Sequence, residues 1–131
     1  MKNKILIFTC IIVILASTAS ANVLKGLRYY EDIVLAKIDD SEKLIPLEIW
    51  KGEKSHAANV IKSSNESLKY ISALKRAGFT EALILSGRSR AKTPEGHIVA
   101  SSLTIWMKNG GYMLHGTRYK LSELKKFCRV Q

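Results

Sequence analysis

Cysteine and histidine are scarce in this 131-residue sequence, and their scarcity excludes several kinds of site. The two cysteines are Cys10, within an apolar amino-terminal run, and Cys128, close to the carboxyl end. Removal of the amino-terminal run leaves one thiol, so an internal disulfide is excluded. The three histidines, His56, His97 and His115, lack the H-x-x-H or H-x-x-x-H spacing of metal ligands. We therefore expect neither a metal site nor a cofactor.

The sequence also lacks an apolar run long enough to span a bilayer comfortably. The run from Ile5 to Ala16 is shorter than the about 20 residues of a transmembrane helix. It follows the positive segment Met1–Lys4 and precedes Ala19-Ser20-Ala21, the A-x-A pattern of a signal-peptidase site. We expect residues 1–21 to be a cleavable signal peptide of bacterial type and residues 22–131 to form a single domain, periplasmic or secreted, with no membrane span after cleavage. The alternative is an uncleaved anchor.

Acidic residues are few relative to basic ones. The chain has 21 Lys+Arg against 11 Asp+Glu, and loss of Lys2 and Lys4 with the signal peptide lowers the formal net charge from +10 to +8. In the cytoplasm this balance would point first to nucleic acid. Export makes nucleic acid an unexpected partner and favours an anionic envelope component, such as lipopolysaccharide, phospholipid headgroups or acidic glycans, or an envelope protein. The alternative is diffuse charge that only keeps the domain soluble.

The first half of the exported domain predicts a hairpin followed by a helix. Residues 32–38 and 44–50 are rich in β-branched and aliphatic side chains, and Pro46 indicates an edge strand or a bulge. Apolar residues at helical spacing predict a helix over about 55–77. Ser63-Ser64-Asn65 can break this helix, with Ser64 or Asn65 as the cap of a second piece, and Gly78 is suited to end it.

The second half predicts three strands and a short closing helix. The strands are expected at 81–86, 97–107 and 112–115, with Asn109-Gly110 as a strong hairpin signal between the last two. Leu121, Leu124 and Phe127 have the spacing of a helix. The order of elements predicts an α+β fold: a small antiparallel sheet of about five strands, one main helix packed on a face and a short C-terminal helix.

The segment after residue 86 carries the most suggestive chemistry. Gly87-Arg88-Ser89-Arg90-Ala91 approximates the G-x-S-x-G turn that presents a catalytic serine, but loop residues follow it where that turn needs a helix. We therefore assign no catalytic residue. Arg88, Arg90 and Lys92 alternate with small residues between two predicted strands, and arginine forks suit phosphate or carboxylate. These three are the predicted binding residues, and the alternative is a solvated loop.

Cys128 has two interpretations. Its neighbours Lys125, Lys126 and Arg129 give it a cationic setting that favours the reactive thiolate, and therefore an intermolecular disulfide or a covalent homodimer. Phe127 and Val130 instead favour a buried, inert thiol.

The class of protein is predicted from export, small size, positive charge and the lack of a catalytic cluster. No motif supports a resemblance to a known family. We expect a non-catalytic binding or assembly protein of the bacterial cell envelope, such as an accessory factor of a pilus, secretion or conjugation system. The alternative is a small secreted hydrolase or toxin, or its immunity or inhibitor protein, whose chemistry would involve Ser89, His97 or His115.

Overall fold

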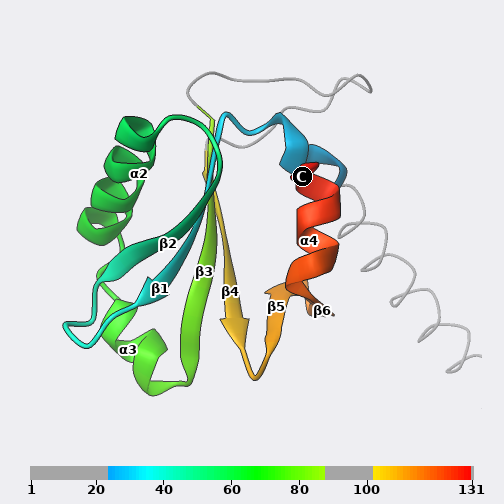
Figure 1. Cartoon of the computed structure of the whole chain (residues 1–131). Coiled ribbons are helices and arrows are strands. Elements are labelled where there is room, and N and C mark those ends of the chain that lie inside the picture. Colours follow the sequence, from blue (N-terminus) through cyan, green and yellow to red (C-terminus); the bar gives the residue numbers. More distant parts are fainter. Residues whose placement is uncertain (1–23, 88–101, 131) are drawn as a thin grey trace, which may run out of the picture.

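The computed structural model describes residues 24–87 and 102–130, which fold into one antiparallel sheet with helices on both of its faces (Figure 1). The strands lie in the order β2-β1-β3-β4-β5-β6. Their bounds are β1 Asp32–Ile38, β2 Leu44–Lys51, β3 Phe79–Ser86, β4 Ser102–Lys108, β5 Gly111–Leu114 and β6 Thr117–Tyr119. The helices are η1 Leu27–Tyr29, α2 Lys54–Ser67, α3 Ile71–Arg76 and α4 Leu121–Cys128. The predicted α+β class is confirmed, and the sheet has one strand more than expected.

Several sequence predictions fall on residues outside the described ranges. They are the signal peptide at residues 1–21, the binding loop with Arg88, Arg90 and Lys92, the candidate residues Ser89 and His97, and the first part of the strand predicted at 97–107. Within residues 24–87 and 102–130, no helix has the length and apolar character needed to cross a membrane.

The predicted hairpin is formed by β1 and β2, with β2 at the edge of the sheet. The turn between them is held by Asp39, whose carboxylate accepts a hydrogen bond of 2.9 Å from the Lys43 backbone N–H. Pro46 lies opposite Ala36, next to a register shift between Leu35 and Ala36. Proline has no N–H to donate to a neighbouring strand, so an edge position beside a bulge accommodates it. Pro46 therefore marks both an edge strand and an irregularity.

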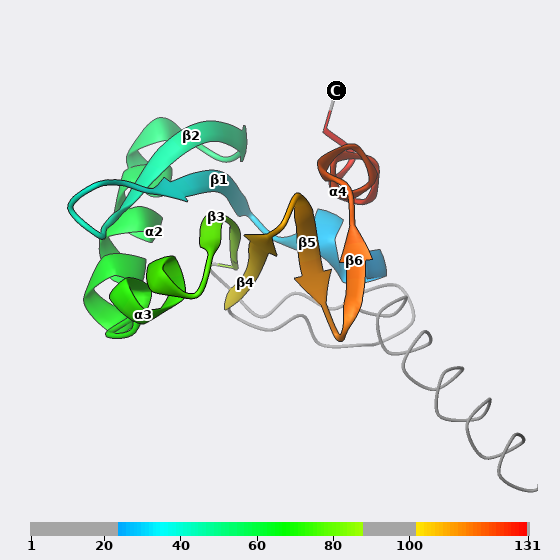
Figure 2. The same ribbon diagram turned by 90° about the horizontal axis from the view of Figure 1, so that it is seen from below.

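Helices cover both faces of the central strands, so successive side chains of β1 enter different cores. Ile33 and Leu35 face η1 and α4, whereas Val34 and Ala36 face α2 and α3. The first core contains Leu24, Leu27, Tyr30, Ile33, Leu35, Leu83, Leu85, Ile105, Tyr112, Leu114, Leu124 and Cys128. The second contains Val34, Ala36, Ile38, Leu44, Ala57, Ile61, Ile71, Ala82 and Ile84. Figure 2 shows α2 and α3 on one side of the sheet and α4 on the other.

The long helix breaks at a different place from the one predicted. It continues through Ser63-Ser64-Asn65 to Ser67, and α3 begins at Ile71. Asn65 does not cap a second piece, because its side chain binds Leu44 at the start of β2. Its carbonyl oxygen accepts from the Leu44 N–H at 2.8 Å, and its amide donates to the Leu44 carbonyl at 3.0 Å. Asn65 thus supplies the hydrogen bonds that a neighbouring strand would supply to this edge residue.

Residues in left-handed conformation end α3 and form the last turns of the sheet. Gly78 follows α3 with φ of 98°, as predicted for a helix end. Asn109 and Gly110 have φ of 54° and 78° and join β4 to β5, which confirms the predicted hairpin. His115-Gly116 forms a second such turn, with φ of 49° and 77°, and leads into β6. That strand was missed because histidine is a weaker turn signal than asparagine and the strand is only three residues long.

Candidate functional site: a basic cleft beside the end of α4

Two adjoining hollows lie where the first described residues meet the end of α4. Their volumes are about 320 Å³ and about 440 Å³, and Arg28 and Arg129 line both. We call the pair the basic cleft. It is lined by Leu24, Lys25, Arg28, Tyr29, Trp50, Lys51, Lys126, Phe127, Cys128 and Arg129. The lining combines arginine and lysine side chains with aromatic ones, and none of these residues is acidic.

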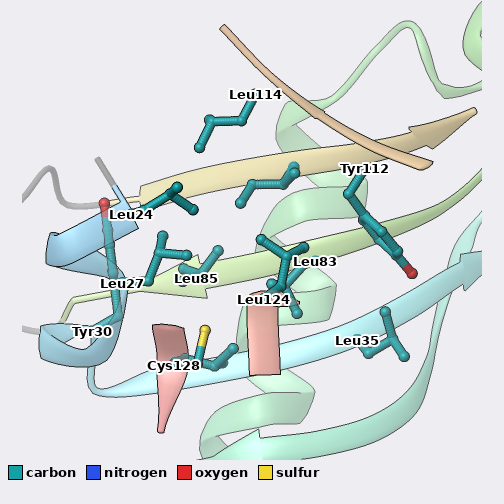
Figure 3. Close-up of a cluster of buried hydrophobic side chains, with 12 residues drawn as sticks. Leu24, Leu27, Tyr30, Leu35, Leu83, Leu85, Tyr112, Leu114, Leu124 and Cys128 are labelled. Carbon is teal, nitrogen blue, oxygen red and sulfur yellow. The ribbon is translucent and has the colours of Figure 1, made fainter. Parts of the chain in front are cut away.

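The cations face outward because their apolar neighbours are anchored in the core. Leu24 and Leu27 are buried in the first core together with Leu124 and Cys128 of α4 (Figure 3). Lys25, which follows Leu24, is exposed as a result. On α4 the buried positions are one helical turn apart, which leaves the residues between and after them at the surface. Two amphipathic segments therefore meet with their charged residues on the same rim.

Arg28 is the most constrained cation of the cleft. Its Nη2 donates a 2.7 Å hydrogen bond to the Tyr29 hydroxyl, and its guanidinium carbon lies 4.8 Å from the centre of the Tyr29 ring. Lys51 Nζ donates to the Arg28 carbonyl at 2.8 Å, which places a second cation beside it. The Arg28 Nε–H is buried and has no hydrogen-bond partner. A buried donor without a partner costs about 1–3 kcal/mol, so this N–H lowers the stability of the folded chain.

Arg129 occupies a position at which glycine is usual. It follows α4 in the left-handed conformation, with φ of 56°. Its N–H bonds to the Lys126 carbonyl at 3.1 Å, and the Val130 N–H bonds to the Lys125 carbonyl at 3.0 Å, so the helix end is closed by backbone groups alone. The left-handed conformation costs a residue with a side chain about 1–2 kcal/mol. The fold therefore tolerates a costly residue here, and this residue lines both hollows of the cleft.

Lys125, near the cleft, forms an ion pair with the Glu48 carboxylate. Lys125 Nζ lies 3.7 Å from Glu48 Oε2 and 5.6 Å from the centre of the Trp50 ring. Trp50 Nε1 donates to the same Glu48 oxygen at 2.9 Å. This surface cluster fixes the Trp50 ring at the side of the cleft and locally neutralises Lys125.

Cys128 lines one hollow, but its thiol belongs to the core, where the residue is 5% exposed. Burial raises the pKa of Cys128 to about 11, and the positive charge of Lys51 offsets part of that rise. The thiol is therefore neutral at physiological pH, which favours the second of its two interpretations. An intermolecular disulfide stays a prediction, and it requires the end of α4 to open.

A second concavity lies between α2 and the sheet, with a volume of about 410 Å³. Asp32, at the start of β1, is 1% exposed, and its Oδ1 lies 3.9 Å from Nδ1 of His56 on α2. Gly52 packs against this carboxylate with φ of 97°, and a Cβ at residue 52 would collide with Asp32 Oδ1. The concavity is lined by Asp32, His56, Asn59, Val60, Ser63, Ser64, Ser67, Leu68, Ile84, Leu85, Ser86, Ser102 and Thr104.

The structure brings together few of the residues that the sequence analysis singled out. Ser89 and His97 lie outside the described residues, as do the three cations of the predicted loop. His115 is exposed in a turn. In the described part of the chain, no group of three or more His, Cys, Asp or Glu side chains could hold a metal ion.

The basic cleft and the Asp32–His56 pair were not predicted, because neither has a local motif. Arg28 and Arg129 lie near opposite ends of the described sequence. The cationic neighbours of Cys128 were noted for their effect on the thiol, and they are part of the signal that could have found the cleft. Comparisons of the chain with protein-family models, curated proteins and solved structures find no match.

Proposed function

We propose that this chain is an exported, non-catalytic binding protein of the bacterial cell envelope that holds an anionic partner through its basic surface. The observation that carries the proposal is the basic cleft, in which Arg28 of η1, Lys51 of β2 and Arg129, just after α4, come together from distant parts of the sequence. The predicted signal peptide supports action in the periplasm or outside the cell. Such a protein suits the role of an accessory factor of a pilus, secretion or conjugation system.

Electrostatics supports an anionic partner for the cleft. Folding brings Arg28, Lys51 and Arg129 to one hollow, and no carboxylate lines it among the described residues. Like charges repel, so an anion that enters the cleft relieves this repulsion. The aromatic side chains of Tyr29 and Trp50 add area for contact with a less polar part of the partner.

A matched pair of charge reversals tests whether the cleft or the overall charge binds the partner. The processed protein is used to capture partners from solubilised envelopes. Lys126→Glu with Arg129→Glu alters the cleft, whereas Lys62→Glu with Lys69→Glu alters exposed lysines of α2 and the turn after it. Both pairs change the net charge equally. We expect the first pair to abolish partner capture and the second pair to leave most of it. Equal loss of capture from both pairs would mean that the overall charge, and not the cleft, binds the partner.

The predicted binding loop has a test of its own. Charge reversal at Arg88, Arg90 and Lys92 in the same capture experiment is expected to weaken binding if the loop contributes to the basic surface. Unchanged capture would remove the loop from the proposal and leave the cleft as its basis.

One observation favours a second candidate function, a small secreted hydrolase acting at the envelope. Asp32 lies 3.9 Å from His56 in a concavity rich in hydroxyl groups, and a carboxylate can orient an imidazole as a general base. His56 would then take a proton from water as the water oxygen attacks the substrate, and that proton would leave with the departing group. His56→Gln should abolish hydrolysis of envelope polymers in zymograms, and Lys62→Gln, at an exposed position of the same helix, is the control. Activity that survives His56→Gln would remove this candidate.

A further inference from the structure

We infer that the basic cleft binds the phosphate of an anionic lipid headgroup, with the Phe127 ring entering the membrane interface beside it. This inference rests on the proposed function and names its partner. Two features of the cleft support it: a pair of arginines that line both hollows, and an exposed apolar side chain on the same rim.

The guanidinium pair points to an oxyanion with several acceptor atoms. Arg28 and Arg129 line both hollows, so an anion at their shared wall can reach both side chains. Arg28 Nη2 donates to the Tyr29 hydroxyl, which holds the Arg28 side chain in place at this wall. A tetrahedral phosphate can accept from Arg28 and from Arg129 at once, because it presents acceptor oxygens in different directions. Lys51, which donates to the Arg28 carbonyl, adds positive charge beside this site.

The exposed apolar side chain points to a lipid as the carrier of that phosphate. Phe127 is 39% exposed and lines one hollow together with Leu24, so part of an aromatic ring is open to solvent within a ring of cations. A free phosphate would gain nothing from this ring. At an anionic membrane the ring enters the boundary between headgroups and acyl chains while neighbouring lysines stay at headgroup level. Lys25 and Lys126 line the same hollow and are exposed, as that arrangement requires.

Vesicle sedimentation tests the inference with the processed protein. Vesicles of phosphatidylcholine alone are compared with vesicles of equal parts phosphatidylcholine and phosphatidylglycerol. We expect binding only to the second kind, weakening as salt rises, since each cation near an anionic surface contributes about a fivefold change in partitioning.

Three variants assign the binding to the cleft. Phe127→Ala should reduce partitioning by about threefold to tenfold through loss of apolar contact. Tyr70→Ala is its control, because Tyr70 is 52% exposed but lies just before α3, on the other side of the sheet. Arg28→Lys keeps the positive charge but removes the planar guanidinium with its paired N–H donors. A fall in partitioning of about threefold or more would therefore show that the phosphate is recognised by its geometry and not by charge alone. Equal effects of Phe127→Ala and Tyr70→Ala, or full binding by Arg28→Lys, would overturn the inference. Thermal unfolding of each variant shows whether it is folded.

Two further arms separate this inference from the proposed function. Inorganic phosphate and soluble polyglutamate are offered to the same protein. If phosphate binds at the cleft and vesicles do not, the ligand is a free anion and the lipid is excluded. If polyglutamate binds and the Lys126→Glu, Arg129→Glu pair abolishes its binding while vesicles stay unbound, the lipid inference fails and the proposed function stands. If vesicles, phosphate and polyglutamate all fail to bind, and the charge reversals leave envelope capture unchanged, both the lipid inference and the proposed function are overturned.

Discussion

Replacement of Arg129 by glycine should strengthen the fold and weaken the binding at the same time. Arg129 has φ of 56°, a conformation that costs a residue with a side chain about 1–2 kcal/mol and glycine almost nothing. Glycine also raises the conformational entropy of the unfolded chain, which lowers the gain in folding free energy by about 0.4–1 kcal/mol. The closing hydrogen bonds of Arg129 and Val130 use backbone groups, so they are kept. The net gain is about 0.5–1 kcal/mol, or a rise of roughly 2–6 °C in Tm for a domain of this size.

Thermal unfolding by circular dichroism and vesicle sedimentation measure the two effects on the same samples. Partitioning should fall by about fivefold because one cation of the cleft is lost. Arg76→Gly is the matched control: Arg76 is exposed in the last turn of α3 with helical conformation, so glycine there lowers stability by about 1 kcal/mol and leaves binding unchanged. A fall in Tm for Arg129→Gly would contradict the account of the helix end, and full binding would remove Arg129 from the phosphate site.

Three further predictions concern stability and the thiol. Asn65→Ala should lower the free energy of unfolding by about 2–3 kcal/mol in urea titrations, because both backbone groups of Leu44 lose their partner, and an unchanged midpoint would refute that role. Gly52→Ala should cost more than about 2 kcal/mol, since its φ of 97° is strained for alanine and the new methyl group meets Asp32, and a variant as stable as the parent would show that the carboxylate can move. Because burial raises the pKa of Cys128 to about 11 from an ordinary 9.0, alkylation of the native thiol at pH 8 should be far slower than in urea. The neutral Cys128 thiol contributes fully to the free energy of unfolding below pH 9, and this contribution declines as the pH rises towards 11. The Cys128→Ala variant should lack this decline in stability with pH.

The elements with strong local signals were predictable from the sequence. β1 matches its predicted range, and Gly78 and Asn109-Gly110 mark a helix end and a hairpin as expected, because a left-handed backbone restricts the residue types that fit. The break after Ser67 could not be predicted in this way. Asn65 stays helical because its amide binds Leu44, a contact between segments that are distant in the sequence.

The candidate site could not be predicted from the sequence either, because it also depends on contacts between distant segments. The alternation of buried and exposed residues in α4 is a local pattern, and it was partly predicted from Leu121, Leu124 and Phe127. The position of Arg28 beside Arg129 depends on the packing of η1 against α4 across the first core, which no spacing rule describes. Tertiary contact, and not composition, makes a cleft from separate charged residues.

The meeting of η1 and α4 at the cleft also couples ligand binding to the stability of the whole domain. A ligand that contacts Arg28 and Arg129 joins the first and last described helical segments, and it cannot bind when α4 is undocked. At a concentration of 100 times its Kd, it stabilises the folded chain by about 2.7 kcal/mol. A disulfide can stabilise a small domain in a similar way, but Cys128 has no cysteine partner among the described residues. The anion at the cleft would act as a reversible crosslink, present only where the partner is abundant.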